Sequence, residues 1–119
     1  MFIKDPQTCD EIIARDETTL RELLHPDKAG LDIRYSLAHA TVKPGQSSRP
    51  HKLKTSEVYY ILEGEGIMYV EGESAKVRSG QAIYIPPNSV QYIQNIGNSD
   101  LKFLCIVDPA WRPEDEEIL

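Results

Sequence analysis

Residues 64–97 read GEGIMYVEGESAKVRSGQAIYIPPNSVQYIQNIG, and this stretch decides the fold. Turn residues recur in it at intervals of 8, 8, 8 and 9 positions, at Gly64, Gly72, Gly80, Asn88 and Gly97. The segments between them are short and carry β-branched or aromatic residues, which favour strands over helices. Such regular punctuation is typical of short antiparallel strands in a sandwich or a barrel.

Strands are predicted on both sides of this stretch as well. Within it we expect strands over 67–70, 75–77, 82–85 and 90–94, and outside it over 33–42, 57–62 and 101–107. With the segment around residue 51 they make about eight strands, which hide their edges most readily in a closed or double-sheet β-barrel. The fold class is therefore all-β.

We expect one domain over residues 1–119, divided into an N-terminal extension (1–30), a barrel (31–108) and an acidic C-terminal tail (109–119). A short N-terminal helix is predicted because Thr19 and Glu22 form a capping-box pattern ahead of three leucines. His25-Pro26 should end that helix. The tail carries two prolines and four consecutive acidic residues, so we expect an appendage and not a strand, with Trp111 packing it against the barrel.

Composition excludes several classes of protein. With 40% hydrophobic and 27% charged residues the chain has the composition of a globular protein. Thirteen basic against 19 acidic residues give a net charge of −6, which argues against a nucleic-acid partner. No apolar run approaches the roughly 20 residues that span a membrane, and we expect no secretion signal because residues 1–6 lack an apolar stretch. Cys9 and Cys105 are interpreted as reduced thiols, and we expect a cytoplasmic protein.

Three polar residues are predicted to converge inside the barrel. Alternate residues of a strand share a face, so His51 points inward if Lys52 and Lys54 point outward. By the same alternation Glu57 lies on one face with Tyr59, and Gln91 lies on one face with Ile93 and Asn95. A charge inside a barrel is costly unless it is paired or bound to metal. Two interpretations remain open: an idle hydrogen-bonded pair, or a functional site with His51 and Glu57 as candidate catalytic residues.

Two motifs resemble those of the cupin family. The first is Gly45, five residues, His51, one residue, Leu53, three residues, Glu57, six residues and Gly64. The second is Gly80, five residues, Pro86, one residue, Asn88, two residues, Gln91, three residues and Asn95. The resemblance implies a small jelly-roll barrel, often a homodimer, with a ligand or metal site inside one end.

The departures from the family pattern concern the metal ligands. Cupins that bind metal well usually present His, His, Glu and His, and here Leu53 and Gln91 stand at the second and last histidine positions. The remaining metal set is His51, Glu57 and Gln91, which would hold a divalent ion such as Mn, Fe, Ni or Zn only loosely, with waters completing the shell. The two-histidine, one-carboxylate arrangement of oxygen-activating iron is missing, which argues against a dioxygenase.

Three functions are consistent with these residues. The first is a small-molecule-binding cupin with a degenerate metal site, whose interior takes a compact polar, sugar-like organic ligand. Besides His51 and Glu57, its ligand-binding residues would be Leu53, Tyr59, Gln91, Ile93 and Asn95. The second is an enzyme of the sugar isomerase, epimerase or lyase kind, metal-dependent or metal-free, with Glu57 or His51 as general base. The third is a non-catalytic sensor module that uses the fold for dimerisation.

Overall fold

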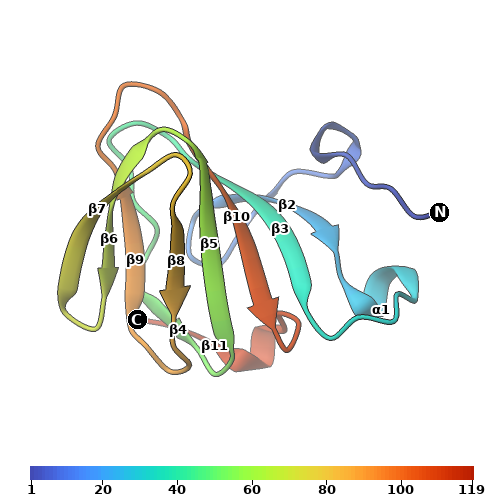
Figure 1. Cartoon of the computed structure of the whole chain (residues 1–119). Helices are drawn as coiled ribbons and strands as arrows, with labels where there is room; N and C mark the ends of the chain where they lie inside the picture. The colour runs from blue at the N-terminus through green and yellow to red at the C-terminus, as the bar shows by residue number, and fades with distance from the viewer.

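The computed structural model describes all residues 1–119 and contains two antiparallel sheets packed face to face (Figure 1). The six-stranded sheet has the order β1 (Ile12–Ile13), β2 (Thr19–Leu24), β3 (Ser36–Val42), β10 (Leu101–Asp108), β5 (Ser56–Glu63) and β8 (Ala82–Ile85). The five-stranded sheet has the order β11 (Glu116–Ile118), β4 (His51–Leu53), β9 (Gln91–Asn95), β6 (Glu65–Val70) and β7 (Glu73–Arg78). The expected jelly-roll barrel is confirmed.

Alternation along the central strands builds the core. β10 pairs with β3 on one side and β5 on the other, and every second residue from Leu101 to Val107 is buried. Phe103, at the centre of β10, is fully buried and packs on Tyr59 of β5, with ring centroids 4.5 Å apart. One cluster of eleven buried residues fills the space between the two sheets.

The N-terminal helix predicted over Thr19–Leu24 is wrong, because this segment is strand β2. It pairs with β3 in the register Leu20↔Ala40 and with β1 through Ile12↔Leu20. A helix of six residues has little stability of its own because its first turn is costly to nucleate. As a strand, the same segment forms backbone hydrogen bonds with β3. Near the start the structure has only a 3-10 turn, Pro6–Thr8, and the four-residue helix α1, Pro26–Ala29.

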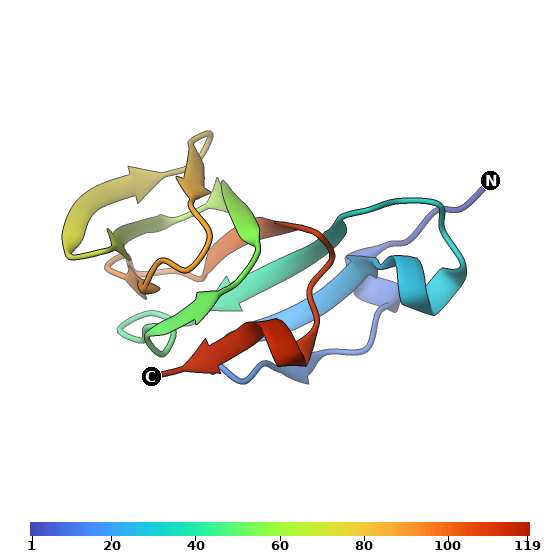
Figure 2. The ribbon, with the colours of Figure 1, turned by 90° about the horizontal axis from the view of Figure 1, so that it is seen from below.

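The C-terminal tail is not a free appendage, and the expectation that it holds no strand is wrong. After the 3-10 turn Pro113–Asp115, β11 pairs with β4 in the register Glu116↔Leu53 and Ile118↔His51. The pairing covers an edge of β4 that would otherwise be open, and Glu117 lies 3.5 Å from Lys52 across the two strands. In Figure 2 the C-terminal strand (red) lies beside the N-terminal segment (blue), where Arg15 donates to the carbonyl of Pro113 at 3.0 Å.

None of the helices is long or apolar enough to cross a membrane.

Candidate functional site

A cavity of about 200 Å³ lies at the end of the barrel that the two terminal segments cover. Its inner wall comes from the barrel strands β3, β4, β5 and β10, and its outer wall from residues 12–20 and from the C-terminal segment. The barrel contributes His51, Leu53, Glu57, Tyr59, Phe103 and Cys105, and the terminal segments contribute Ile12, Asp16, Leu20, Trp111 and Glu116, among others. The cavity therefore has a polar end and an apolar body.

His51 lies on β4 and is 2% exposed. Its Nδ1 lies 2.7 Å from the carbonyl oxygen of Arg49, which can only accept, so Nδ1 carries a proton and donates. Its Nε2 lies 3.6 Å from Asp16 Oδ2, which is too long for a hydrogen bond. In the neutral ring Nε2 is thus an open acceptor on the cavity wall.

Glu57 and Gln91 form a buried pair next to His51. His51 and Gln91 are register partners of β4 and β9, and Gln91 Nε2 donates to Glu57 Oε1 at 2.9 Å. Gln91 itself does not line the cavity, and its Oε1 is buried without a hydrogen-bond partner. Gln91 is therefore a positioning residue, whose hydrogen bond fixes the orientation of the Glu57 carboxyl from outside the cavity.

The environment of Glu57 raises the pKa of its carboxyl to about 8. Burial is the main cause, repulsion from Asp16 and Glu116 adds to it, and the hydrogen bond from Gln91 opposes it. Glu57 is consequently protonated at neutral pH and can donate a hydrogen bond into the cavity. Carboxyl groups with pKa values moved toward neutrality occur often at functional sites.

Two acidic residues of the site come from outside the predicted barrel. Asp16 is buried, and its Oδ1 accepts from the backbone N–H and the hydroxyl of Thr18 at 3.1 and 2.7 Å. Glu116 is half-buried on β11, where burial raises the pKa of its carboxyl against the attraction of His51. Sequence reasoning missed both, because they lie in segments that carry no strand pattern of their own.

The remaining predicted site residues fall into two groups. Leu53 and Tyr59 line the cavity, and the Tyr59 hydroxyl forms no hydrogen bond within the chain although the residue is 2% exposed. Ile93 and Asn95 face inward as the alternation predicts but do not line the cavity. Asn95 instead donates to the carbonyls of Val42 and Ser99 and accepts from the Gly97 N–H, which ties down the loop after β9.

Cys105 also lines the cavity, between Tyr59 and the half-buried Ala38. Burial raises the pKa of its thiol well above the ordinary value. The thiol therefore stays protonated and is a poor nucleophile.

The donor set does not fit a metal centre. No group of three or more His, Cys, Asp or Glu side chains is arranged to hold an ion. Leu53 offers no donor, and Gln91 turns its amide N–H toward Glu57. We therefore assign no step of chemistry to a metal at this site.

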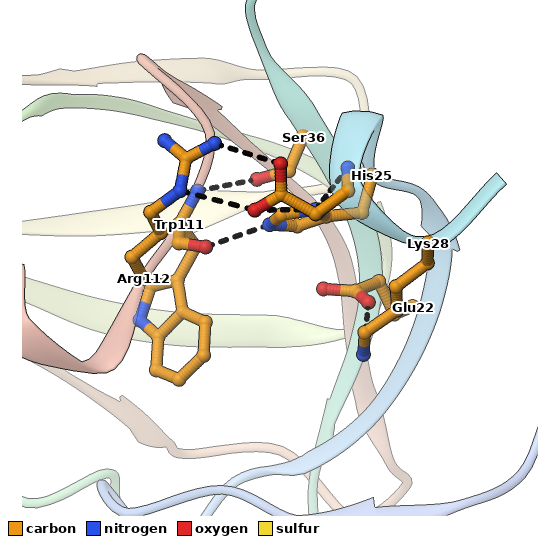
Figure 3. A network of polar contacts seen from close by, with 7 residues as sticks. Glu22, His25, Lys28, Ser36, Trp111 and Arg112 are labelled. Atoms are coloured by element: carbon orange, nitrogen blue, oxygen red, sulfur yellow. Dashed lines mark hydrogen bonds and ion pairs between the residues drawn. The ribbon is translucent and has the colours of Figure 1, made fainter. Parts of the chain in front are cut away.

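A network of polar contacts joins Trp111 and Arg112 of the C-terminal segment to residues 25–36 (Figure 3). His25 Nδ1 accepts from the Asp27 N–H at 3.1 Å, so its Nε2 carries the proton and donates to the Trp111 carbonyl at 2.7 Å. The Trp111 N–H donates to Ser36 Oγ at 2.9 Å. Arg112 reaches both carboxylate oxygens of Asp27 at 3.1 Å, and beside it Lys28 pairs with Glu22. These contacts place the Trp111 side chain on the cavity wall.

Fold and cavity together define a small double-sheet β-barrel with a ligand-sized hollow inside one end. Residues 38–107 match the model of the cupin domain. The chain therefore belongs to the cupin family.

Comparisons with individual proteins agree with this assignment. The chain is 46% identical over 108 residues to the uncharacterized protein MJ1618 of Methanocaldococcus jannaschii, covering 90% of this chain and 86% of that one. It is 34% identical over 88 residues to the oxalate-binding protein of Thermotoga maritima, covering 73% and 68%. A crystal structure of a predicted oxalate decarboxylase from Thermotoga maritima superposes with a TM-score of 0.80 at 23% identity, covering 91% and 99%, and shows likeness of fold.

Proposed function

We propose that this chain is a small-molecule-binding cupin whose cavity takes a compact polar organic ligand. The observation that carries the proposal is the convergence of open polar groups on a cavity of about 200 Å³: His51 Nε2, the Glu57 carboxyl and the Tyr59 hydroxyl. Buried polar groups are normally hydrogen-bonded. Polar groups that face the cavity and have no hydrogen bond within the chain are therefore available to bind a ligand. A mostly apolar cavity with a few convergent polar groups is the usual form of a small-ligand site.

The relatives support a ligand-binding role. The Thermotoga maritima relative is named an oxalate-binding protein. We do not transfer oxalate itself, because Asp16 and Glu116 line this cavity, and its two cations, Arg15 and Lys28, already lie beside the carboxylates of Glu116 and Glu22. A free dianion would meet carboxylates there without an unpaired positive charge to compensate it.

The test is a metabolite screen monitored by melting temperature, because a ligand of the native state raises stability by mass action. Ala38→Leu places a larger side chain on the cavity wall and should abolish the shift that any hit produces. Ala75→Leu, on the exposed face of β7, is the matched control and should keep it. Hits that shift wild type and Ala38→Leu equally would contradict binding inside the barrel.

An enzyme of the isomerase, epimerase or lyase kind is the second candidate, favoured by one observation. Glu57, protonated at neutral pH, and His51, with an open Nε2, give the cavity both a proton donor and a proton acceptor. Such a pair suits removal and return of a proton next to a carbonyl without metal. Incubating the protein with small hydroxycarbonyl compounds in D₂O tests this, because catalysis exchanges that C–H for C–D. Loss of the exchange in His51→Ala would support it, and no exchange with any compound would contradict it.

We also propose a homodimer formed by the outer face of the six-stranded sheet. Apolar side chains that the chain leaves uncovered gather there on adjacent strands: Tyr60, Leu62, Tyr84 and Ile106. An ion pair lies at each end of this strip, Arg34–Asp108 at one end and Lys102–Glu63 at the other. Each end therefore carries both signs of charge, so a second copy related by a two-fold axis can pack against it without repulsion between like charges. Mass measurement in solution should give two chains for wild type and for Ile96→Lys, and one for Tyr60→Lys. A monomeric wild type at micromolar concentration contradicts the dimer, and with it the sensor role that depends on it.

A cytoplasmic location remains part of the proposal. It is supported by two cysteines that are both free.

A further inference from the structure

The distribution of charge around the cavity is uneven. Its lining includes the carboxyl groups of Asp16, Glu57 and Glu116, and the only formally cationic residues among those that line it are Arg15 and Lys28. Their side chains are 49% and 70% exposed, and each is already next to a carboxylate, Glu116 at 3.9 Å and Glu22 at 2.5 Å. Both cations are therefore largely exposed to solvent and already paired, whereas Asp16 is buried.

Two acceptor atoms on the cavity wall share a gap that no donor of the chain fills. Asp16 Oδ2 and His51 Nε2 are 3.6 Å apart, and neither has a hydrogen bond. Asp16 Oδ1 accepts hydrogen bonds from Thr18, which leaves Oδ2 without a hydrogen bond. The proton of His51 is on Nδ1, which donates to the Arg49 carbonyl, so Nε2 is the free acceptor. A single group with two N–H bonds can lie within hydrogen-bond distance, about 2.9 Å, of both acceptors at once.

The apolar side chains that line the cavity indicate the chemical nature of the remainder of the ligand. Ile12, Leu20, Phe103 and Val107 line it together with the indole of Trp111. These side chains favour an uncharged hydrocarbon or ring portion of the ligand.

We propose that the cavity selects a small organic primary amine in its ammonium form, with the –NH₃⁺ group between Asp16 and His51 and an uncharged body against Trp111. This inference rests on the proposed function, since it names the ligand class of the same cavity. An ammonium group donates up to three hydrogen bonds and compensates the buried carboxylate of Asp16, which a neutral hydroxyl does not. The net charge of −6 also steers cations toward the protein.

The test uses one skeleton with three head groups: cyclohexylamine, cyclohexanol and cyclohexanecarboxylate. Trp111 is the only tryptophan of the chain and lines the cavity, so its fluorescence reports occupancy directly. At pH 7 we expect the amine to bind at least about tenfold more tightly than the alcohol, the equivalent of one charge-assisted contact, and the carboxylate not to bind.

Variants assign the preference to the proposed atoms. Asp16→Asn keeps the Oδ1 contact to Thr18 while removing the charge, and should reduce the preference for amine over alcohol to near unity. Glu117→Gln, one residue beyond Glu116 and outside the cavity, should leave it intact. If Asp16→Asn does not fold, Glu116→Gln takes its place and should weaken amine binding alone.

The outcomes separate this inference from the proposed function. Equal binding of amine and alcohol, tighter binding of the carboxylate, or an unchanged preference in a folded Asp16→Asn protein would overturn the amine assignment while leaving a ligand-binding cavity. Failure of all three probes overturns it as well. Failure of the metabolite screen in addition would overturn both.

Discussion

Gln91 donates a hydrogen bond from Nε2 to Oε1 of Glu57, and both side chains are buried between the two sheets. The amide suits either state of the carboxyl, because Nε2–H serves an ionised Glu57 and Oε1, after a flip of the amide, accepts from a protonated one. In the observed orientation the hydrogen bond favours the ionised carboxyl, but burial outweighs it, so Glu57 keeps its proton at neutral pH.

The raised pKa of Glu57 makes stability depend on pH in a defined direction. The native state keeps the Glu57 proton up to about pH 8, whereas the unfolded chain releases it near the ordinary value of 4.5. Between these values the native state binds more protons, so this group's contribution to stability is complete below pH 4.5 and is lost as pH rises toward 8, by on the order of 1 kcal/mol per pH unit.

Urea unfolding from pH 5 to pH 9 measures that slope. Glu57→Gln keeps the shape and removes the titration, so its unfolding free energy should fall less steeply with pH than that of wild type. The exposed Glu63→Gln is the control and should follow wild type. Parallel profiles for wild type and Glu57→Gln would show that the carboxyl is ionised throughout.

Metal affinity should increase when the two departures from the family pattern are reversed. Leu53→His combined with Gln91→His adds two imidazoles to His51 and Glu57 and also removes the amide that turns toward Glu57. With Ni²⁺ or Zn²⁺ at a hundredfold excess over its dissociation constant, the double variant should gain about 3 kcal/mol of stability. Wild type should show at most a small shift with Mn, Fe, Ni or Zn, because its side chains offer too few donors. A wild type stabilised as strongly as the double variant would contradict our reading of the donor set.

His25 should contribute more to the stability of the protein, by anchoring the C-terminal segment, than the exposed Arg112–Asp27 ion pair beside it. His25→Ala removes the partner of the Trp111 carbonyl and the acceptor of the Asp27 N–H, and should cost about 1–3 kcal/mol of stability and weaken ligand binding. Arg112→Ala breaks a solvent-exposed pair with Asp27 and should change stability little. Urea unfolding ranks the two variants, and an Arg112→Ala loss equal to that of His25→Ala would place the anchor elsewhere.

Gly64, which ends the first motif, is required for close packing as well as for its backbone angle. Its φ is +90°, and a Cβ there would lie 2.9 Å from the carbonyl oxygen of Asp100. Gly64→Ala should destabilise the protein by more than about 2 kcal/mol, whereas Gly72→Ala, at φ +79° with open space around it, should cost about 1 kcal/mol. Equal losses in thermal unfolding would mean that the contact with Asp100 relaxes freely.

Sequence reasoning worked where local pattern and tertiary structure agree. β8 begins and ends at the predicted residues, Ala82 and Ile85, because turn residues bound a short β-branched segment. The inward positions of His51, Glu57 and Gln91 follow from the two-residue period of their strands.

The errors lie where a distant segment decides the outcome. Thr19–Leu24 carries a helix-start pattern, but pairing with β3 determines its conformation. Glu116 belongs to an acidic run with no strand pattern, and its place on the cavity wall depends on the free edge of β4. Asp16 reaches the site because the Arg49 N–H donates to its carbonyl at 2.7 Å, a contact that no local motif predicts.

The central claim, that a ligand binds inside the barrel at the polar end, is tested most directly by NMR of the three histidine rings. His51 lines the cavity, His25 fastens the tail, and His39 lies on β3 in a separate polar groove lined by Arg21 and Lys102. On titration with a ligand found in the screen, we predict the largest change at His51 Nε2, together with a change in the Gln91 side-chain amide signals, and none at His39. Changes at His39 with an unaltered His51 would place the ligand outside the barrel and contradict the account.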